Sequence, residues 1–310
     1  MVNQPSFNPN ADRSNRGGQL RNRAVTDVFE PGSTMKPFTV AAALDRGTIR
    51  ADSQIDTSPG YFRVGAAQVR DSKDLGVIDV ATVLSKSSNV GAGKIALGLE
   101  KKNLWQAMDA LGFGSPAQIG FPGEADGQLS DYRRWARIDQ ATLSFGYGIS
   151  VTTLQLAQAY GALANDGVLL PATLIKRDAA PEGRRVFSAG TAAAVREMLE
   201  AVASVDGTAP QAAVQGYRVA GKTGTVKKFG PQGYSDDRYL SLFAGMAPAR
   251  QPRVAMVVML NEPRAGKFYG GQVAGPVFSA VMAETLRLMN VAPDVVVDPK
   301  LRVAHAGEAR

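Results

Sequence analysis

The chain contains no cysteine and only one histidine, His305, which lies close to the C-terminal end. Without cysteine, the chain can form no disulfide, no thiolate nucleophile and no cysteine-ligated metal site. A single histidine cannot build a multi-histidine metal site, and a Ser-His-Asp triad would have to recruit it from a short polar tail. A covalent mechanism in this chain therefore takes its base from a lysine or a carboxylate, and we expect neither a metal nor a cofactor.

Long apolar runs are also missing, because no stretch reaches the length of about 18 residues that a membrane-spanning helix needs. Residues 1–10 lack the charged and apolar regions of a signal peptide, so we expect a soluble fragment or a mature soluble domain. Lys and Arg outnumber Asp and Glu by 35 to 28, and such a surplus can favour anionic partners. The basic residues are scattered, however, and the densest groups are pairs, so we predict no nucleic-acid binding.

Hydrophobic residues make up 45% of the 310-residue chain, which is enough to build a large core. Helical patterns are expected over residues 33–46, 79–84, 90–97, 154–163, 192–202 and 274–289. Strand patterns are expected over residues 217–226, 240–246 and 253–260, with 230–237 connecting two strands as a hairpin. We predict an α/β (α+β) fold with two lobes: an antiparallel sheet flanked by helices, and an all-helical lobe. Residues 294–310 lose the pattern and are predicted to form a flexible tail.

Ser33 and Lys36 form the first candidate pair, at the start of a predicted helix. Residues three apart lie on one helical face, so the hydroxyl and the amine can come within hydrogen-bonding reach. Serine is a weak nucleophile until a base takes its proton, and a buried lysine can act as that base when its pKa falls. Free N–H groups at a helix N-terminus also stabilise a developing oxyanion. The spacing alone fits an ordinary helix-capping serine equally well.

Two further groups carry chemistry. Ser87 and Asn89 flank Ser88 between two predicted helices, where a hydroxyl can relay a proton and an amide can bind a peptide bond. Lys222, Thr223, Gly224 and Thr225 lie on a predicted strand, and alternation places both threonines on one face. Two hydroxyls and an ammonium form a receptor for a carboxylate, and the glycine permits close approach of a ligand backbone. Alternatively, the first group caps a helix and the second is a glycine-punctuated edge strand.

The order of the three groups is more specific than any one of them. Ser-x-x-Lys, Ser-x-Asn and Lys-Thr-Gly follow one another in the expected helix-start, loop and strand contexts. This ordered set is the signature of serine β-lactamases and penicillin-binding proteins. Because the chain offers no cysteine and one tail histidine, the combination favours a serine enzyme that uses lysine as its base.

Longer segments resemble the class B penicillin-binding proteins, in particular the septal (cell-division) D,D-transpeptidases of the penicillin-binding protein 3 type. These segments are Phe29–Pro37, Phe145–Ala157, Val219–Thr225 and Gly266–Gly271. The resemblance covers residues 2–293 and implies a serine transpeptidase/β-lactamase-like fold, with one transpeptidase domain over residues 1–293. Such proteins carry a pedestal domain and a membrane anchor, which we do not expect within these residues. We therefore expect an excised domain of a protein at the periplasmic face of the inner membrane.

The resemblance also implies roles for individual residues. Ser33 would attack the penultimate D-Ala carbonyl of a stem peptide, with Lys36 as the favoured base, and an amine of a second stem would then resolve the acyl-enzyme into a cross-link. Ser87 and Lys222 would pass the proton to the leaving amine, and Asn89 would hold the substrate amide. The backbone N–H groups of Ser33 and Thr225 would form the oxyanion hole. Thr223 and Thr225 would bind the terminal carboxylate, and Gly224 would lie beside the ligand. The wall of the cleft would be formed by Tyr147, Phe268 and Tyr269.

The same resemblance implies the partners, which are peptidoglycan stem peptides, β-lactam antibiotics and, for the full-length protein, membrane proteins of the division complex. Three alternatives stay open from the sequence. A serine β-lactamase would need a base for water, and Glu124 lies in roughly the right region but within a Pro/Gly turn. A D,D-carboxypeptidase shares the donor chemistry and differs only in its acceptor. A catalytically silent β-lactam sensor or scaffold would keep the three motifs.

Overall fold

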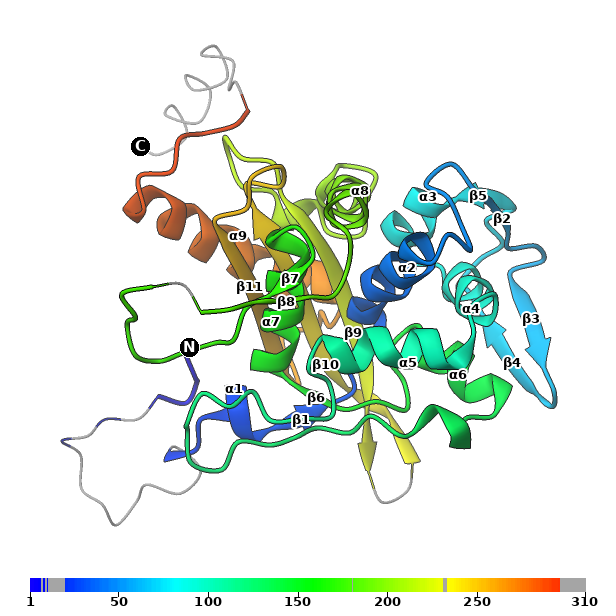
Figure 1. Ribbon diagram of the computed structural model, residues 1–310, viewed down its shortest axis with the longest axis horizontal. Coiled ribbons are helices and arrows are strands. Elements are labelled where there is room, and N and C mark those ends of the chain that lie inside the picture. Colours follow the sequence, from blue (N-terminus) through cyan, green and yellow to red (C-terminus); the bar gives the residue numbers. More distant parts are fainter. Residues whose placement is uncertain (7, 9, 11–19, 180, 231–232, 296–310) are drawn as a thin grey trace.

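The computed structural model describes residues 1–6, 8, 10, 20–179, 181–230 and 233–295 (Figure 1). Its helices are α1 (Arg23–Thr26), η3 (Gly32–Met35), α2 (Lys36–Asp45), α3 (Val80–Ser85), α4 (Asn89–Leu97), α5 (Lys101–Ala110), η4 (Tyr132–Arg134), α6 (Arg137–Leu143), α7 (Thr153–Ala164), α8 (Ala189–Glu200), η5 (Ala201–Ala203), η6 (Pro210–Ala212) and α9 (Gly270–Leu288). Its strands are β1 (Val28–Phe29), β2 (Gln54–Asp56), β3 (Tyr61–Val64), β4 (Ala67–Arg70), β5 (Val77–Asp79), β6 (Val151–Thr152), β7 (Val168–Leu169), β8 (Arg184–Arg185), β9 (Ala220–Gly230), β10 (Gly233–Ala247) and β11 (Val254–Asn261).

The central sheet comes from the C-terminal third of the chain, as predicted, and its strands are antiparallel in the order β11-β10-β9. Helix α9 packs along this sheet, where Phe278 meets Phe243 of β10 edge-to-face with ring centroids 4.7 Å apart. Figure 1 shows α7 and α8 on the opposite side of the sheet from α9. Helices on both faces explain why the β10 residues from Ser241 to Ala247 are buried regardless of the alternation along the strand. Strand β9 forms one edge of the sheet.

The hairpin is longer than the sequence pattern predicted. Residues 230–237 were expected to connect two strands, but β9 continues to Gly230 and β10 already starts at Gly233. Tyr234 pairs with Phe229, and the register shifts between Tyr234 and Tyr239. A hairpin can extend through polar residues because backbone pairing needs no apolar side chains, so hydrophobic alternation underestimates its length.

The second lobe is built around α2, whose residues Phe38, Val40 and Ala41 are fully buried. The sequence predicted one helix over residues 33–46, whereas the structure has a 3-10 turn, η3, followed by α2. Pro37 accounts for this difference because it has no N–H to donate to the carbonyl of Ser33. Lys36 N donates to that carbonyl instead, which closes the tighter 3-10 turn.

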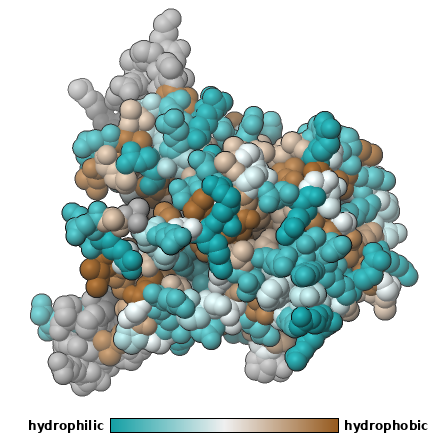
Figure 2. Space-filling model, viewed as in Figure 1, coloured by the Kyte–Doolittle hydropathy of each residue, from teal (hydrophilic) through white to brown (hydrophobic). Residues whose placement is uncertain are grey.

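Polar residues are spread over the face drawn in Figure 2, and hydrophobic residues form small separated groups there. Within the described residues, no helix is both long and apolar enough to cross a bilayer. Helix α9 begins at Gly270, four residues earlier than predicted. Of the predicted flexible tail, residues 296–310, including His305, lie outside the described residues.

Candidate active site

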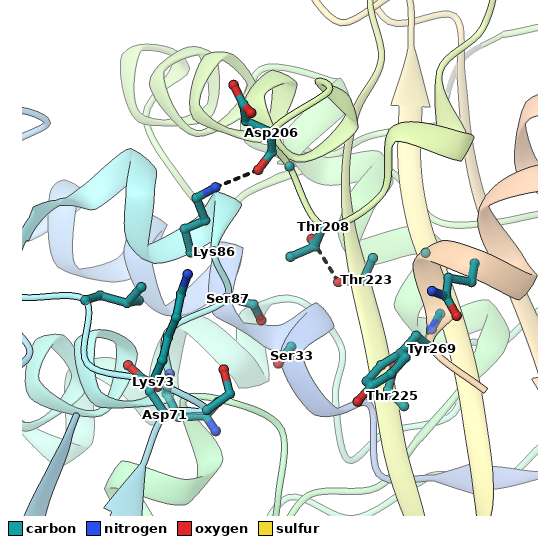
Figure 3. Close-up of a pocket in the computed structure, with 17 residues that line it drawn as sticks. Ser33, Asp71, Lys73, Lys86, Ser87, Asp206, Thr208, Thr223, Thr225 and Tyr269 are labelled. Atoms are coloured by element: carbon teal, nitrogen blue, oxygen red, sulfur yellow. Dashed lines mark hydrogen bonds between the residues drawn. The ribbon is translucent and has the colours of Figure 1, made fainter. Parts of the chain in front are cut away.

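A cleft of about 510 Å³ lies between the β9 edge of the sheet and the helical lobe (Figure 3). Six of the residues predicted from sequence line it: Ser33, Ser87, Asn89, Thr223, Thr225 and Tyr269. Lys36 and Lys222 are fully buried, and both reach the Ser87 hydroxyl. Segments far apart in the sequence therefore meet at one place.

Ser33 lies in η3, and tight backbone contacts hold this turn in place. Gly32 has a φ of +57°, and its N–H donates to the carbonyl of Gly146 over 3.2 Å. Tyr160 Oη, inside the core, donates to the carbonyl of Thr34 over 3.0 Å. Neither η3 nor α2 has a side-chain cap, so the Ser33 hydroxyl does not serve as a helix cap. It lines the cleft instead.

Lys36 is fully buried, and its side-chain nitrogen makes three hydrogen bonds to Ser87 and Asn89 at the start of α4. Nζ donates to the carbonyl of Ser87 over 2.6 Å, to Ser87 Oγ over 3.0 Å and to Asn89 Oδ1 over 2.8 Å. Burial lowers the pKa of Lys36 well below its ordinary value, and the charge of Lys222 lowers it further, while Asp71 acts in the opposite direction. Within the described residues no hydrogen bond joins Lys36 to Ser33, so the direct pairing suggested by their spacing is not formed here.

Lys222 approaches the same hydroxyl from the sheet. Its Nζ donates to Ser87 Oγ over 3.0 Å and to Thr223 Oγ1 over 3.3 Å. Burial lowers the pKa of Lys222 to about 7. Two buried amines with lowered pKa values on one hydroxyl are suited to proton transfer, because a lowered pKa makes it easier for a lysine to lose its proton.

The three side chains of residues 87–89 make different contacts. Ser88 caps α4 by accepting from the N–H of Gly91 over 2.8 Å, so the helix-cap interpretation holds for this residue. Ser87 and Asn89 face the cleft on either side of it. The Asn89 amide is oriented by two contacts, since Oδ1 accepts from Lys36 and Nδ2 donates to the carbonyl of Arg70 over 3.2 Å.

The threonines of β9 line the cleft, as their alternation predicted. Thr223 Oγ1 lies 3.2 Å from Thr208 Oγ1, and Thr225 Oγ1 accepts from the N–H of Gly270 over 2.9 Å. Gly224 has another reason to be a glycine than the one proposed from sequence. A Cβ there would lie 3.1 Å from the carbonyl oxygen of Pro31 and 3.1 Å from Thr34, so the close approach comes from η3 itself.

The three aromatic residues predicted as a cleft wall do not share one position. Tyr269 lines the cleft and is exposed. Phe268 stacks on Tyr239 with ring centroids 4.2 Å apart and touches Tyr269, so it supports the wall from behind. Tyr147 is not among the residues that line this cleft, and it packs edge-to-face on Tyr234 at 5.7 Å.

Sequence reasoning missed several polar residues of the cleft: Asp71, Lys73, Lys86, Asp206 and Thr208. Figure 3 shows Lys73, Lys86 and Asp206 on the side of the cleft opposite β9. Lys86 Nζ donates to the carbonyl of Asp206 over 2.7 Å. These residues come from loops after β4, after α3 and before β9, where neither periodicity nor a motif marks them. Their positions depend on tertiary contacts.

A serine-bearing turn, two buried lysines on one hydroxyl and an edge strand with hydroxyls match the arrangement expected of a serine acyltransferase that uses lysine in place of histidine. The family model described as "Penicillin binding protein transpeptidase domain" matches residues 1–283. The chain belongs to the penicillin-binding protein transpeptidase family, and its predicted fold class is confirmed.

Two named proteins with similar sequences support the assignment to this family. The chain is 44% identical to "Probable peptidoglycan D,D-transpeptidase PenA" of Neisseria flavescens over 293 residues, which are 94% of this chain and 73% of that protein. It is 43% identical over 296 residues to "Peptidoglycan D,D-transpeptidase FtsI" of Escherichia coli (strain K12), covering 96% of this chain and 50% of that protein. The chain thus spans about half of the E. coli relative and nearly three quarters of the Neisseria one.

A solved structure has the same fold. The apo structure of the TP domain of penicillin-binding protein 3 from Burkholderia pseudomallei aligns with a TM-score of 0.86 at 47% identity, covering 89% of this chain and 84% of that one.

Proposed function

We propose that this chain is the catalytic domain of a septal peptidoglycan D,D-transpeptidase, with Ser33 as the nucleophile. The observation that carries the proposal is the shared hydroxyl of Ser87, which accepts from Lys36 and Lys222 over 3.0 Å each beside a cleft lined by Ser33. No such arrangement is needed for stability, because burying two amines costs desolvation energy. Relatives named as peptidoglycan D,D-transpeptidases support the same function.

In the acylation step, Ser33 Oγ attacks the carbonyl carbon of the penultimate D-Ala, and its proton passes to neutral Lys36. The backbone N–H groups of Ser33 and Thr225 stabilise the oxyanion. The leaving amine of the terminal D-Ala takes its proton from the unit formed by Ser87 and Lys222. Burial supports this assignment because it lowers the pKa of both lysines, that of Lys222 to about 7.

Substrate binding in this proposal follows the edge of the sheet. Thr223 and Thr225 hold the terminal carboxylate, and Thr208, whose Oγ1 lies 3.2 Å from that of Thr223, adds a third hydroxyl on that side. Asn89 Nδ2 keeps one N–H beyond the one given to Arg70, and this N–H can donate to the stem peptide. Tyr269 covers the open side of the cleft. An amine of a second stem then attacks the ester, releases Ser33 and forms the cross-link.

The geometry favours slow hydrolysis of a β-lactam adduct. Fast hydrolysis requires a base positioned to activate water. Glu124, the residue considered for that task, is not among those that line the cleft, and its Oε1 accepts from the N–H of Phe121 over 3.0 Å. The transpeptidase proposal is therefore favoured over the β-lactamase alternative.

The proposal extends to the protein of which this chain is the catalytic part. Residues 1–293 are proposed to act as one transpeptidase domain, consistent with the family match over residues 1–283. In the full-length protein, the domain would work at the periplasmic face of the inner membrane, next to membrane proteins of the division complex. The relative named FtsI supports this placement.

A fluorescent penicillin tests the proposal. Intact mass and peptide mapping should find one adduct, on Ser33, and the adduct should persist for many minutes. Ser33→Ala should abolish labelling, whereas Ser72→Ala, which changes an exposed serine lining the same cleft, should keep it. An adduct on another residue, or rapid penicillin turnover, would contradict the assignment. A D-Ala-D-Ala thioester offered with an amine acceptor should yield the amide product, and hydrolysis alone would favour a carboxypeptidase.

A further inference from the structure

The loop over residues 87–89 holds a conformation that it does not favour by itself. Ser87 has a φ of +60°, in the left-handed region that side chains other than glycine rarely adopt. In this conformation its carbonyl and its hydroxyl both face Lys36 Nζ. Such strain persists only where the surrounding structure enforces it. Something outside the loop must therefore hold it.

Asp71 meets this loop with both carboxylate oxygens. Oδ1 accepts from the backbone N–H of Asn89 and, over 3.1 Å, from that of Val90. Oδ2 accepts from the hydroxyl of Ser88, which in turn accepts from the N–H of Gly91. Together, Asp71 and Ser88 satisfy the N–H groups of the whole first turn of α4, just after the strained residue.

Asp71 is itself held on a separate element. It follows β4, which pairs with β3, and its N–H donates to the carbonyl of Gly60 over 2.9 Å. The preceding residue, Arg70, accepts the Asn89 side-chain amide at its carbonyl. The end of β4 thus fixes both the backbone and the side chain of Asn89.

We propose that Asp71 is a positioning residue for acyl transfer, which keeps Ser87 and Asn89 in the conformation that engages the two buried lysines. This inference rests on the proposed function. Asp71 does not need to touch the substrate for this role, because its carboxylate is occupied by the loop. It acts through Ser87 and Asn89, which relay the proton and bind the stem peptide.

Asp71→Ala tests the role, with Asp79→Ala as its matched control. Asp79 caps α3 by accepting from the N–H of Thr82 over 2.7 Å, so its loss removes the same kind of helix cap without touching the loop. Asp71→Ala should slow acylation by penicillin by about 10²-fold, the scale expected when reacting groups are displaced by about 1 Å. Asp79→Ala should lower the melting temperature comparably and leave the acylation rate within about threefold of the parent.

Asp71→Asn provides the conservative rescue. Its amide oxygen can still accept from Asn89 and Val90, so most of the acylation rate should return. Hydrogen exchange gives a readout that is independent of activity, and the amides of Asn89 and Val90 should exchange faster in Asp71→Ala but not in Asp79→Ala.

Three results would overturn the inference: unchanged exchange at Asn89 and Val90, full acylation in Asp71→Ala, or an equal loss of acylation in Asp79→Ala. If penicillin did not acylate the parent protein at all, the proposed function would be contradicted. The hydrogen-exchange rates of Asn89 and Val90 would still decide whether Asp71 holds the loop.

Discussion

Lys36 and Lys222 donate to the same hydroxyl oxygen, Ser87 Oγ, each over 3.0 Å. Two ammonium groups held this close inside the protein repel each other, and because both side chains are fully buried the solvent screens this repulsion only weakly. The pair therefore releases a proton more readily than either lysine would alone. Repulsion adds to burial in lowering the pKa of Lys36. The shared hydroxyl joins residues from α2, from the loop before α4 and from β9 into the unit proposed to transfer protons.

The first prediction concerns pH and the rate of acylation. Burial lowers the pKa of Lys222 to about 7, and the pKa of Lys36 also lies well below its ordinary value. A base must be neutral to accept the Ser33 proton, so acylation should fall as pH drops through the lowered pKa of Lys36 and level off above it. Stopped-flow acylation by a chromogenic cephalosporin from pH 5 to 9 measures the profile. A rate that rises towards low pH would contradict a lysine base.

Lys36→Arg is the corresponding substitution. Arginine keeps a positive charge but does not lose its proton in this pH range, so it cannot act as the base. Acylation should fall by about 10²- to 10⁴-fold, the range typical for loss of a general base. Peptide mapping should still place any residual adduct on Ser33. A rate near that of the parent would exclude Lys36 as the base.

The second prediction concerns the stability cost of burying Lys222. Its folded pKa is about 7, against about 10.4 for a lysine in an unfolded chain. Between these values the unfolded chain binds more protons than the folded one, so the free energy of unfolding should rise as pH increases through this window. The gain should be on the order of a few kcal/mol at full burial. Lys222→Gln should remove this part of the rise.

Urea unfolding at several pH values from 7 to 10 measures that slope. Ser33→Ala is the matched control, because it inactivates the site but keeps both lysines buried. It should retain the slope of the parent protein. Equal slopes in Lys222→Gln and in the parent would mean that Lys222 is not neutralised in the folded state.

The third prediction concerns the contact that positions the Ser33 turn. Gly146 has a φ of +84°, and a Cβ there would lie 2.2 Å from the carbonyl oxygen and 2.4 Å from the nitrogen of Gly32. Gly146→Ala should therefore cost the left-handed strain of roughly 1–2 kcal/mol and a further clash of about 1–3 kcal/mol. It should also slow acylation, because the clash moves the residue next to Ser33. Thermal unfolding and penicillin labelling measure the two effects.

Gly148→Ala separates strain from clash. Gly148 has a similar φ of +76°, but a Cβ there would meet nothing within 4 Å. This variant should lose only the strain of roughly 1–2 kcal/mol and stay close to the parent in acylation. Equal losses in the two variants would show that contact with Gly32 is not what places Ser33.

The sequence identified the residues that meet at the cleft better than their surroundings. Ser33, Ser87 and Lys222 belong to short motifs whose order along the chain is specific. The three strands of the sheet were predicted from their apolar or alternating patterns. The helix expected to begin at Ser33 was wrong in its first turn, because Pro37 has no N–H to donate to the carbonyl of Ser33 and the chain forms a 3-10 turn there. The extra strand length of the β9–β10 hairpin carries no apolar signal.

Asp71 and Thr208 were not predicted for a different reason. An aspartate after a strand and a threonine in a loop are common, and both reach the cleft only through tertiary contacts. Gly224 was identified, yet its proposed reason was incomplete, because the group that needs the space is Pro31 of the neighbouring turn. Local patterns report propensity and chemistry, whereas close approach between distant segments depends on the packed structure.

The fourth prediction concerns a hydrogen bond between the hairpin and the segment before Ser33. Tyr234 Oη donates to Glu30 Oε2 over 2.9 Å, and Glu30 Oε1 accepts from the N–H of Gly148 over 3.0 Å. Glu30 therefore links the β9–β10 hairpin, the turn after Phe145 and the nucleophile segment. Tyr234→Phe keeps the ring on Tyr147 and removes only the hydroxyl. It should cost about 0.5–1.5 kcal/mol of stability and slow acylation a few-fold.

A double-mutant cycle with Glu30→Gln isolates this contact. Glutamine keeps a carbonyl oxygen for Gly148 but loses the charge that strengthens the bond to Tyr234. Because both substitutions weaken the same interaction, the double variant should lose less stability than the sum of the two single losses, by about 0.5–1 kcal/mol. Urea unfolding and acylation rates of all four proteins complete the cycle. Strict additivity in both measurements would show that the hydrogen bond does not couple the hairpin to the Ser33 segment.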